Sequence, residues 1–134
     1  MEKVIVEIEF VSHNFAAHAP ALLGCVATGE TPEEVKRNIK EAIVGHLEVS
    51  AEYNDPVPDV FKGEYELIYK FDVLSLLKYY KGLLGNTAIE RLTGISNKQL
   101  NHYATGHRNP SHATKQKIQK ALNDFGRELI AVEL

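Results

Sequence analysis

Five hydrogen-bonding side chains stand close together in the second half of the chain: Asn97, Lys98, Gln99, Asn101 and His102. Lys98 is the member of this set with a full charge at neutral pH. Amide, imidazole and ammonium groups on an exposed helix can hydrogen-bond to base edges in the major groove of DNA. The same residues would also suit the solvated face of an ordinary helical hairpin, which is the alternative interpretation.

The residues around this cluster predict two short helices joined by a tight turn. Gly94 suits the left-handed backbone at the end of the first helix, and the Ser96 hydroxyl can cap the second helix. We expect the second helix over residues 97–105, closed by Gly106 and followed by Pro110. A helix–turn–helix with an exposed, amide-rich second helix is typical of proteins that bind DNA.

Further polar and basic residues lie beside the predicted helix–turn–helix. Asn86 begins its first helix, where the side-chain amide and the helix N-terminus can bind a phosphate. Arg108 follows the second helix and Lys115 lies in the next one, so both can neutralise phosphates. The candidate DNA-binding residues are therefore Asn86, Asn97, Lys98, Gln99, Asn101, His102, Arg108 and Lys115.

Charge is divided unevenly along the chain. Residues 1–71 hold 13 acidic residues and 6 Lys or Arg, a balance of −7, whereas residues 72–134 hold 5 and 9, a balance of +4. An acidic half and a basic half indicate two partners of opposite charge. We expect nucleic acid to meet the basic half and a basic protein to meet the acidic half.

The first half contains four segments with the composition of β-strands. Apolar and polar residues alternate over residues 3–11, which predicts a strand with one buried face. A short return strand is expected over 15–18 and a third strand over 22–28. Residues 64–71 predict the last strand, with aromatic and aliphatic side chains on one face.

One helix is predicted between the third and last strands. Thr31 can cap it, Pro32 suits its first position, and Glu34 completes a capping box. We expect the helix to end at residues 50–52 and an extended connector to follow over 54–58. The order βββαβ is a small α+β layer, and its exposed sheet edges favour dimerisation, with a monomer that has charged sheet edges as the alternative.

The second half predicts helices alone. Apolar spacing indicates helices over residues 73–81, from residue 86, over 97–105 and over 112–128, and the Ser111 hydroxyl can cap the last of them. The last residues, 129–134, are apolar, and their periodicity fits either an extension of the helix or a strand that helps a dimer form. The domains expected are 1–71, an α+β unit, and 72–134, an all-α helix–turn–helix unit.

Signals for catalysis, metal binding and membrane insertion are poor. His13 and His18 are too isolated for a metal site, and no glycine-rich phosphate loop occurs. We therefore expect no enzyme, no metal and no cofactor. A lone Cys25 suits a reducing, cytoplasmic setting, and no apolar run or charged leader predicts a membrane segment or a signal peptide.

The second half resembles Cro/repressor-type helix–turn–helix domains. The resemblance rests on Gly94-Ile95-Ser96, Leu100, Gly106 and Pro110. It implies base contacts from the residues at Asn97, Lys98 and His102, and a phosphate contact from the residue at Asn86. The family favours a small alanine where Glu90 stands and often a glutamate at Ala104, so Glu90 departs from the pattern where the two helices meet.

The first half is similar to HicB-type antitoxins. The resemblance is carried by residues 20–25 (PALLGC), Gly29, residues 31–34 (TPEE) and Asn38. It implies a partial ribonuclease-H-like fold followed by a DNA-binding domain. It also implies a homodimer or higher homo-oligomer that silences a small basic RNA-cleaving toxin, HicA, and represses the shared operon by binding operator DNA.

Two other functions fit the same residues. One is a helix–turn–helix transcription regulator whose first domain senses a small ligand and which has no toxin partner. The other is a protein-interaction module with a degenerate helix–turn–helix, for which Glu90 is the best support. The strand edges and residues 11–18 are the candidates for contact with a toxin.

Overall fold

The computed structural model describes residues 1–134, which separate into two compact units, Met1–Asp72 and Val73–Leu134. The first unit holds a four-stranded sheet with one long helix, and the second is built from helices. The α+β fold class predicted from the sequence is confirmed. No helix in either unit is both long and apolar enough to cross a bilayer.

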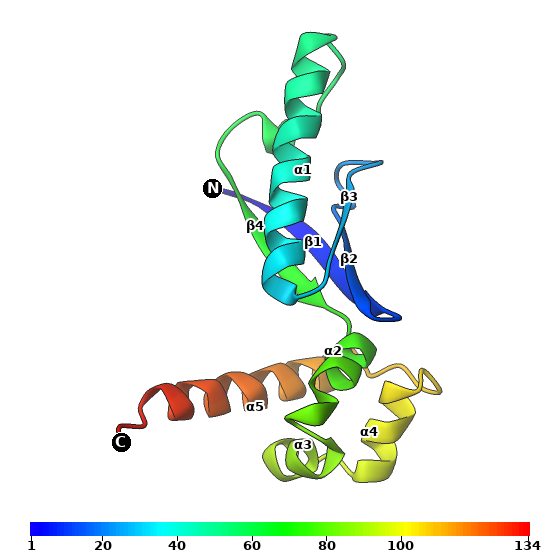
Figure 1. Ribbon diagram of the computed structural model, residues 1–134, viewed down its shortest axis with the longest axis vertical. Helices are drawn as coiled ribbons and strands as arrows, with labels where there is room; N and C mark the ends of the chain where they lie inside the picture. The colour runs from blue at the N-terminus through cyan, green and yellow to red at the C-terminus, as the bar shows by residue number, and fades with distance from the viewer. The chain divides into compact units, whose positions relative to one another are not determined.

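The sheet of the first unit has the strand order β3-β2-β1-β4 (Figure 1). β1 (Glu2–Val11) and β2 (Asn14–His18) form an antiparallel hairpin, and β3 (Val26–Gly29) adds to β2. β4 (Tyr65–Phe71) pairs in parallel with β1, with Val4 opposite Leu67. This parallel pair requires a crossover, which the long helix supplies.

The alternation along β1 determines which face of the sheet is buried. Val4, Val6 and Ile8 are buried, whereas the side chains between them are exposed. The covering helix, α1 (Pro32–Glu52), buries one side at helical spacing, through Val35, Ile39 and Ile43. Figure 1 shows α1 running along this single face, so the sheet is covered on one side.

The start of α1 is tied closely to the end of β3. The Glu34 amide donates to the Thr31 hydroxyl at 3.0 Å, which confirms the predicted cap. The Asn38 side-chain amide donates to the Thr28 carbonyl at 2.8 Å. A Cβ on Gly29 would lie 2.6 Å from the Val35 backbone nitrogen, so strand and helix meet where no side chain fits.

The third strand is shorter than the sequence predicted. Residues 22–28 were expected to be extended, but Leu22 to Cys25 form a turn. The Leu22 amide donates to the Ala19 carbonyl and the Cys25 amide donates to the Leu22 carbonyl. The turn buries Leu22 and Cys25 while exposing Leu23, so apolar composition here reflects an irregular core segment rather than a strand.

The connector after α1 also contains more structure than predicted. A 3₁₀ turn, η1 (Asp59–Phe61), follows the proline pair and buries Phe61. The Phe61 ring meets Tyr65 edge to face, with centroids 5.2 Å apart. This aromatic pair joins the connector to the start of β4.

The second unit comprises four α-helices and a short 3₁₀ turn. These are α2 (Val73–Tyr79), η2 (Tyr80–Gly82), α3 (Asn86–Thr93), α4 (Asn97–Ala104) and α5 (His112–Ile130). The helix predicted over 73–81 thus ends two residues early, because its last turn tightens into η2.

A small apolar core holds these helices together. Leu77, Ile89, Leu100 and Tyr103 are buried together, one or two from each of α2, α3 and α4. Ile118 of α5 is also buried. α5 contacts α3, and α4 contacts both α2 and α3.

The last helix runs further toward the C-terminus than predicted. α5 begins at the Ser111 cap, as predicted, and runs to Ile130, two residues beyond the expected end. Residues 131–134 form neither helix nor strand. Of the segment 129–134, Leu129 and Ile130 therefore extend the helix, and the other four residues take neither of the two expected forms.

Candidate nucleic-acid interface

The turn between α3 and α4 has the backbone that the sequence predicted. Gly94 lies in the left-handed region with φ +76°, and its amide donates to the Glu90 carbonyl at 2.7 Å. The Ser96 hydroxyl accepts from the Gln99 amide at 3.2 Å and caps α4. Thr93 adds a second link, because its hydroxyl accepts from the Ile95 amide at 3.1 Å.

Glu90 belongs to this turn rather than disturbing it. Its Oε2 accepts a hydrogen bond from the Asn97 amide at 2.8 Å. The carboxylate therefore binds an amide that has no partner within α4, at the end where the helix dipole favours negative charge. Glu90, which departs from the helix–turn–helix pattern, thus caps α4 with a side chain from α3 and fixes the two helices relative to each other.

α4 presents two different faces. Leu100 and Tyr103 are buried in the core. Asn97, Lys98 and Asn101 are exposed on the opposite side, with no hydrogen bond from their side chains to the rest of the chain. This outward face carries two amides and one ammonium group, which are groups that can hydrogen-bond to bases and phosphates.

Gln99 and Arg108 form a local network at the side of α4. The Gln99 Nε2 donates to the Tyr103 hydroxyl at 2.9 Å, and the Arg108 guanidinium donates to the Gln99 Oε1 at 3.4 Å. Gln99 is half-buried, so its amide holds Arg108 beside the helix. The Arg108 amide also donates to the His102 carbonyl at 3.2 Å.

Two imidazole rings lie next to this network. The ring centroids of His102 and His107 are 4.9 Å apart, and the two ring planes are tilted by 55°. His102 is half-buried and His107 is exposed. The loop after α4 therefore folds back so that Arg108 and both histidines lie at the same end of the helix.

The remaining candidates lie on neighbouring helices. Asn86 is the first residue of α3, after a Gly85 cap that contributes no side-chain hydrogen bond. Lys115 is exposed in the first turn of α5. The structure thus brings together Gln99, His102 and Arg108, and it places Asn86 and Lys115 each near the N-terminus of another helix.

Three residues near the site were not assigned their roles from the sequence: Glu90, Tyr103 and His107. A signal existed for Glu90, since a carboxylate one turn before Gly94 can reach the first amides after Ser96. The sequence assigned no role to the Tyr103 hydroxyl, which accepts from Gln99. Nothing in the spacing indicates that the His107 ring packs on His102.

Other chemically reactive groups are scattered. No group of three or more His, Cys, Asp or Glu side chains lies close enough to hold a metal ion. Burial raises the pKa of the Cys25 thiol above its usual 9.0, which disfavours the reactive thiolate. His18 pairs with Glu7 at 3.2 Å on exposed strands.

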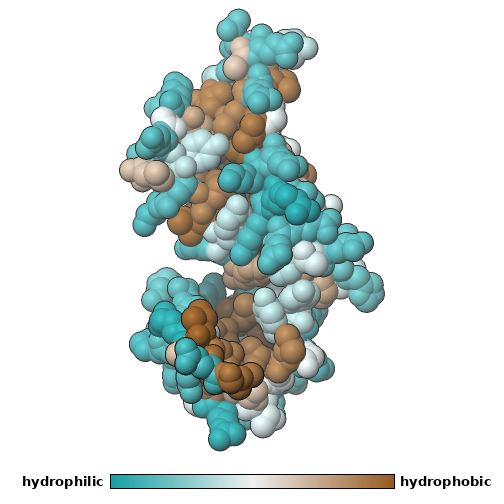
Figure 2. Space-filling model, turned by 60° about the vertical axis from the view of Figure 1, so that its left-hand side comes forward, coloured by the Kyte–Doolittle hydropathy of each residue, from teal (hydrophilic) through white to brown (hydrophobic).

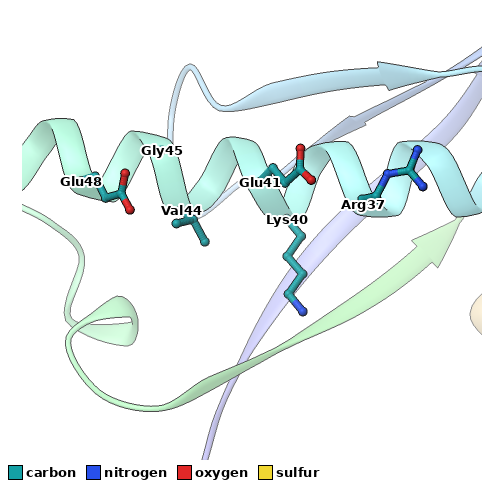
Figure 3. Close-up of a pocket in the computed structure, with 6 residues that line it drawn as sticks. All are labelled: Arg37, Lys40, Glu41, Val44, Gly45 and Glu48. Atoms are coloured by element: carbon teal, nitrogen blue, oxygen red, sulfur yellow. The ribbon is translucent and has the colours of Figure 1, made fainter.

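A depression on the first unit lies along α1 (Figure 3). Its lining residues are all from that helix: Arg37, Lys40, Glu41, Val44, Gly45 and Glu48. Figure 3 shows these six residues spaced along α1. Such a surface gives a small ligand little enclosure, because ligand sites are usually concave and bury most of the ligand.

Comparison with known proteins gives one partial similarity. The chain is 39% identical over 44 residues to UPF0150 protein Ta0767 of Thermoplasma acidophilum. The matched stretch covers 33% of this chain and 64% of that protein, which is less than two thirds of its length. No family model matches the chain, and no solved structure matches it. The chain therefore shows a weak, partial similarity to a UPF0150 protein of HicB-like type, and most of its residues lie outside the match.

Proposed function

We propose that this protein is an antitoxin and autorepressor. The second unit binds operator DNA, with α4 in the major groove, and the first unit binds and neutralises a small basic RNA-cleaving toxin. The observation that carries the proposal is the capped α3–α4 turn, which presents Asn97, Lys98 and Asn101 outward from a helix whose other face is buried.

The chemistry of the outward face supports DNA as its ligand. Asn101 and Asn97 can donate to and accept from a base edge at once, which a solvated helical face does not require. Lys98, Arg108 and Lys115 can neutralise phosphates, and these contacts supply affinity without sequence preference. A dimer would place two copies of α4 about one helical turn of DNA, roughly 34 Å, apart.

The toxin-binding part of the proposal rests on the first unit. It carries the acidic balance of the chain, and an acidic protein can cover the basic surface with which a nuclease binds RNA. The partial similarity to a HicB-like UPF0150 protein points the same way. Inhibition would then be steric and electrostatic, with no chemical step on the antitoxin.

A gel-shift experiment tests the DNA assignment. The probe is the fragment upstream of the protein's own coding sequence, and the comparison is wild type against Lys98→Ala combined with His102→Ala. We expect binding to weaken at least about tenfold, because each base contact is worth roughly 1–3 kcal/mol. Unchanged binding would contradict the proposal that the second unit binds DNA through α4.

The control for charge is Lys62→Ala together with His13→Ala. Both residues are exposed in the first unit, so this variant loses the same side-chain types outside the proposed interface. It should bind the fragment as wild type does. Equal weakening by the two double variants would indicate a general charge effect instead of contacts from α4.

Co-expression with the neighbouring reading frame tests the toxin assignment. If that frame encodes a small basic protein that arrests growth when expressed alone, co-expression with this chain should restore growth, and the two proteins should copurify. A neighbour without such an effect would favour the alternative, a regulator whose first unit senses a ligand.

A further inference from the structure

Two histidines meet at the C-terminal end of α4. His102 belongs to the helix and His107 to the loop that leads from α4 to α5 (Figure 1). Four residues separate them, and zinc-binding histidines commonly have roughly three to five residues between them. Such a spacing permits a shared ion but does not require one, so the contact of the two rings in the fold is the informative observation.

The distance between the rings suits two ligands of one metal ion. A nitrogen bound to Zn²⁺ at about 2.1 Å puts the centroid of its imidazole about 3.2 Å from the ion. With ligand angles of about 90–110°, two such centroids are roughly 4.5–5.2 Å apart. The centroids of His102 and His107 are 4.9 Å apart. Rotation about the Cβ–Cγ bond turns each ring while hardly moving its centroid, so both rings can aim a nitrogen at one ion without a shift of the backbone.

The backbone holds both histidines in place. The His102 carbonyl accepts hydrogen bonds from the Arg108 amide at 3.2 Å and from the Thr105 hydroxyl at 3.3 Å. Gly106 turns the chain with φ +76°, and a Cβ there would lie 3.2 Å from a methyl group of Leu74 in α2. The loop is therefore closed on the end of α4 and packed against α2, so an ion would have little backbone to order when it binds.

The ring nitrogens of this pair are free to act as ligands. Neither His102 nor His107 makes a side-chain hydrogen bond within the chain. Two other histidines are occupied, because the Nε2 of His18 lies 3.2 Å from a carboxylate and that of His112 lies 3.3 Å from a side-chain amide. His107 is exposed and His102 half-buried, so an ion can reach the pair from solvent.

The surroundings of the pair select the class of ion. Mg²⁺ and Ca²⁺ require oxygen ligands, carboxylates above all, and no third His, Cys, Asp or Glu joins this pair. Arg108 lies beside His102, and Lys98 precedes it by one helical turn, so positive charge opposes an ion that is held by charge alone. Neutral imidazole instead suits Zn²⁺, Cu²⁺ and Ni²⁺, which bind nitrogen strongly.

Other parts of the second unit fit a metal ion less well. Figure 2 shows brown, apolar side chains gathered on the side of this unit turned toward the viewer. The carboxylate of Glu90 is bound by the Asn97 amide, and that of Asp124 by Lys120 and Arg127. The histidine pair combines free nitrogens with a suitable distance, which these groups do not.

We propose that His102 and His107 together bind one divalent transition-metal ion of the Zn²⁺ class, with water filling its other positions. Structural zinc sites have about four protein ligands, so a site with two binds more weakly. The ion then exchanges with the surrounding solution, and the site responds to the concentration of free metal. When bound, the ion links the end of α4 to the loop that follows it.

The bound ion has a consequence for DNA, which rests on the proposed function. His102 is a candidate for contact with a base edge, and a ring nitrogen that is bound to a metal cannot also hydrogen-bond to a base. Occupation of the site should therefore weaken the binding of operator DNA.

Calorimetric titration of the full chain with ZnCl₂, without DNA and without a histidine tag, tests the site itself. Wild type should bind one ion per chain with a micromolar dissociation constant. His107→Ala should raise that constant at least about tenfold, because even a residue that only supports a metal ligand is worth about that much. His112→Ala is the matched control, since His112 is exposed in the same unit, and it should bind as wild type does. A wild type that binds no Zn²⁺, or equal weakening by the two variants, overturns the proposal.

Nuclear magnetic resonance of the imidazole groups identifies the ligands directly. The chain has six histidines, and ZnCl₂ should shift the ring signals of His102 and His107 at a concentration that leaves the other four unchanged. MgCl₂ at the same concentration should shift none of them. A response spread evenly over all six rings would indicate an adventitious ion only and would overturn the site.

Fluorescence anisotropy with the operator fragment tests the consequence for DNA. The readout is the ratio of the DNA dissociation constants with and without ZnCl₂, measured separately for each variant. We expect a ratio of at least about five for wild type, through loss of one base contact. The ratio should be near one for His107→Ala, which keeps His102 but lacks the site. A wild-type ratio of one would overturn the effect on DNA, whereas a chain that binds Zn²⁺ but never DNA would contradict the proposed function and leave the metal site standing.

Discussion

The residues of the candidate interface fall into two sets with different roles. Gln99 and Glu90 hold other groups in place, through bonds to Arg108 and to the Asn97 amide. Lys98 and Asn101 point outward and are free to meet a ligand. The side chains that would touch DNA are thus distinct from those that fix the helix presenting them, and substitutions in the two sets should have different signatures.

Replacing Glu90 by alanine should lower the stability of the second unit. The substitution leaves the Asn97 amide without its acceptor, and losing a helix cap costs about 0.5–2 kcal/mol. Glu90→Gln keeps an acceptor oxygen and should lose less. Chemical denaturation of the full chain, followed by circular dichroism, measures both variants, and equal stability of Glu90→Ala and wild type would contradict the capping role.

At the scale of helices and strands, local signals predicted most of the boundaries. Thr31, Ser96 and Ser111 cap their helices as expected, because a cap depends on the few residues that follow it. The strand predicted over residues 22–28 was wrong at residues 22–25, since apolar composition is common to a strand and to a buried turn, and right at residues 26–28. The packing of α1 on Gly29 and the contact of Phe61 with Tyr65 could not be predicted from neighbouring residues. Both depend on how the folded segments approach one another.

The candidate interface was predictable to the same extent. The outward residues of α4 followed from helix periodicity, whereas the links from Glu90, Tyr103 and His107 depend on how chain segments approach one another in space. Glu90 is the clearest case. The sequence indicated a departure from a family pattern, and the three-dimensional structure is needed to see that its carboxylate replaces a close helix contact with a hydrogen bond.

The junction of β3 and α1 gives a prediction about packing. Gly29→Ala should destabilise the first unit by roughly 1–3 kcal/mol, because its methyl group would lie 2.6 Å from the Val35 backbone nitrogen and must push strand and helix apart. Gly63→Ala is the matched control, since a Cβ there meets nothing within 4 Å. Thermal unfolding of both variants measures the difference. Equal melting temperatures would show that strand and helix can move apart at this junction without loss of stability.

For the whole molecule, the division of charge matters more than the net value of −3. The acidic first unit and the basic second unit would each attract a partner of opposite sign. A chain with one uniform charge would repel one of two such partners. Separate units also allow each surface to be tested without altering the other.

The affinity for DNA should therefore depend strongly on salt. Each phosphate contact steepens the slope of log K against log salt by about 0.9, so Lys115→Ala should make the slope shallower by about that amount while leaving sequence preference intact. Fluorescence anisotropy at several salt concentrations measures the slope, with Lys62→Ala as the charge-matched control. A slope equal to that of wild type would place Lys115 outside the phosphate contacts.

The parallel pairing of β1 with β4 has a consequence for synthesis on the ribosome. β1 comprises residues 2–11 and β4 residues 65–71, so the nascent chain closes its hairpin early and completes its sheet late. Until β4 emerges, one edge of β1 has no neighbour, and an open strand edge invites pairing with other chains. Truncated products that end before Glu64 should therefore aggregate, whereas every release point after Phe71 leaves a complete sheet.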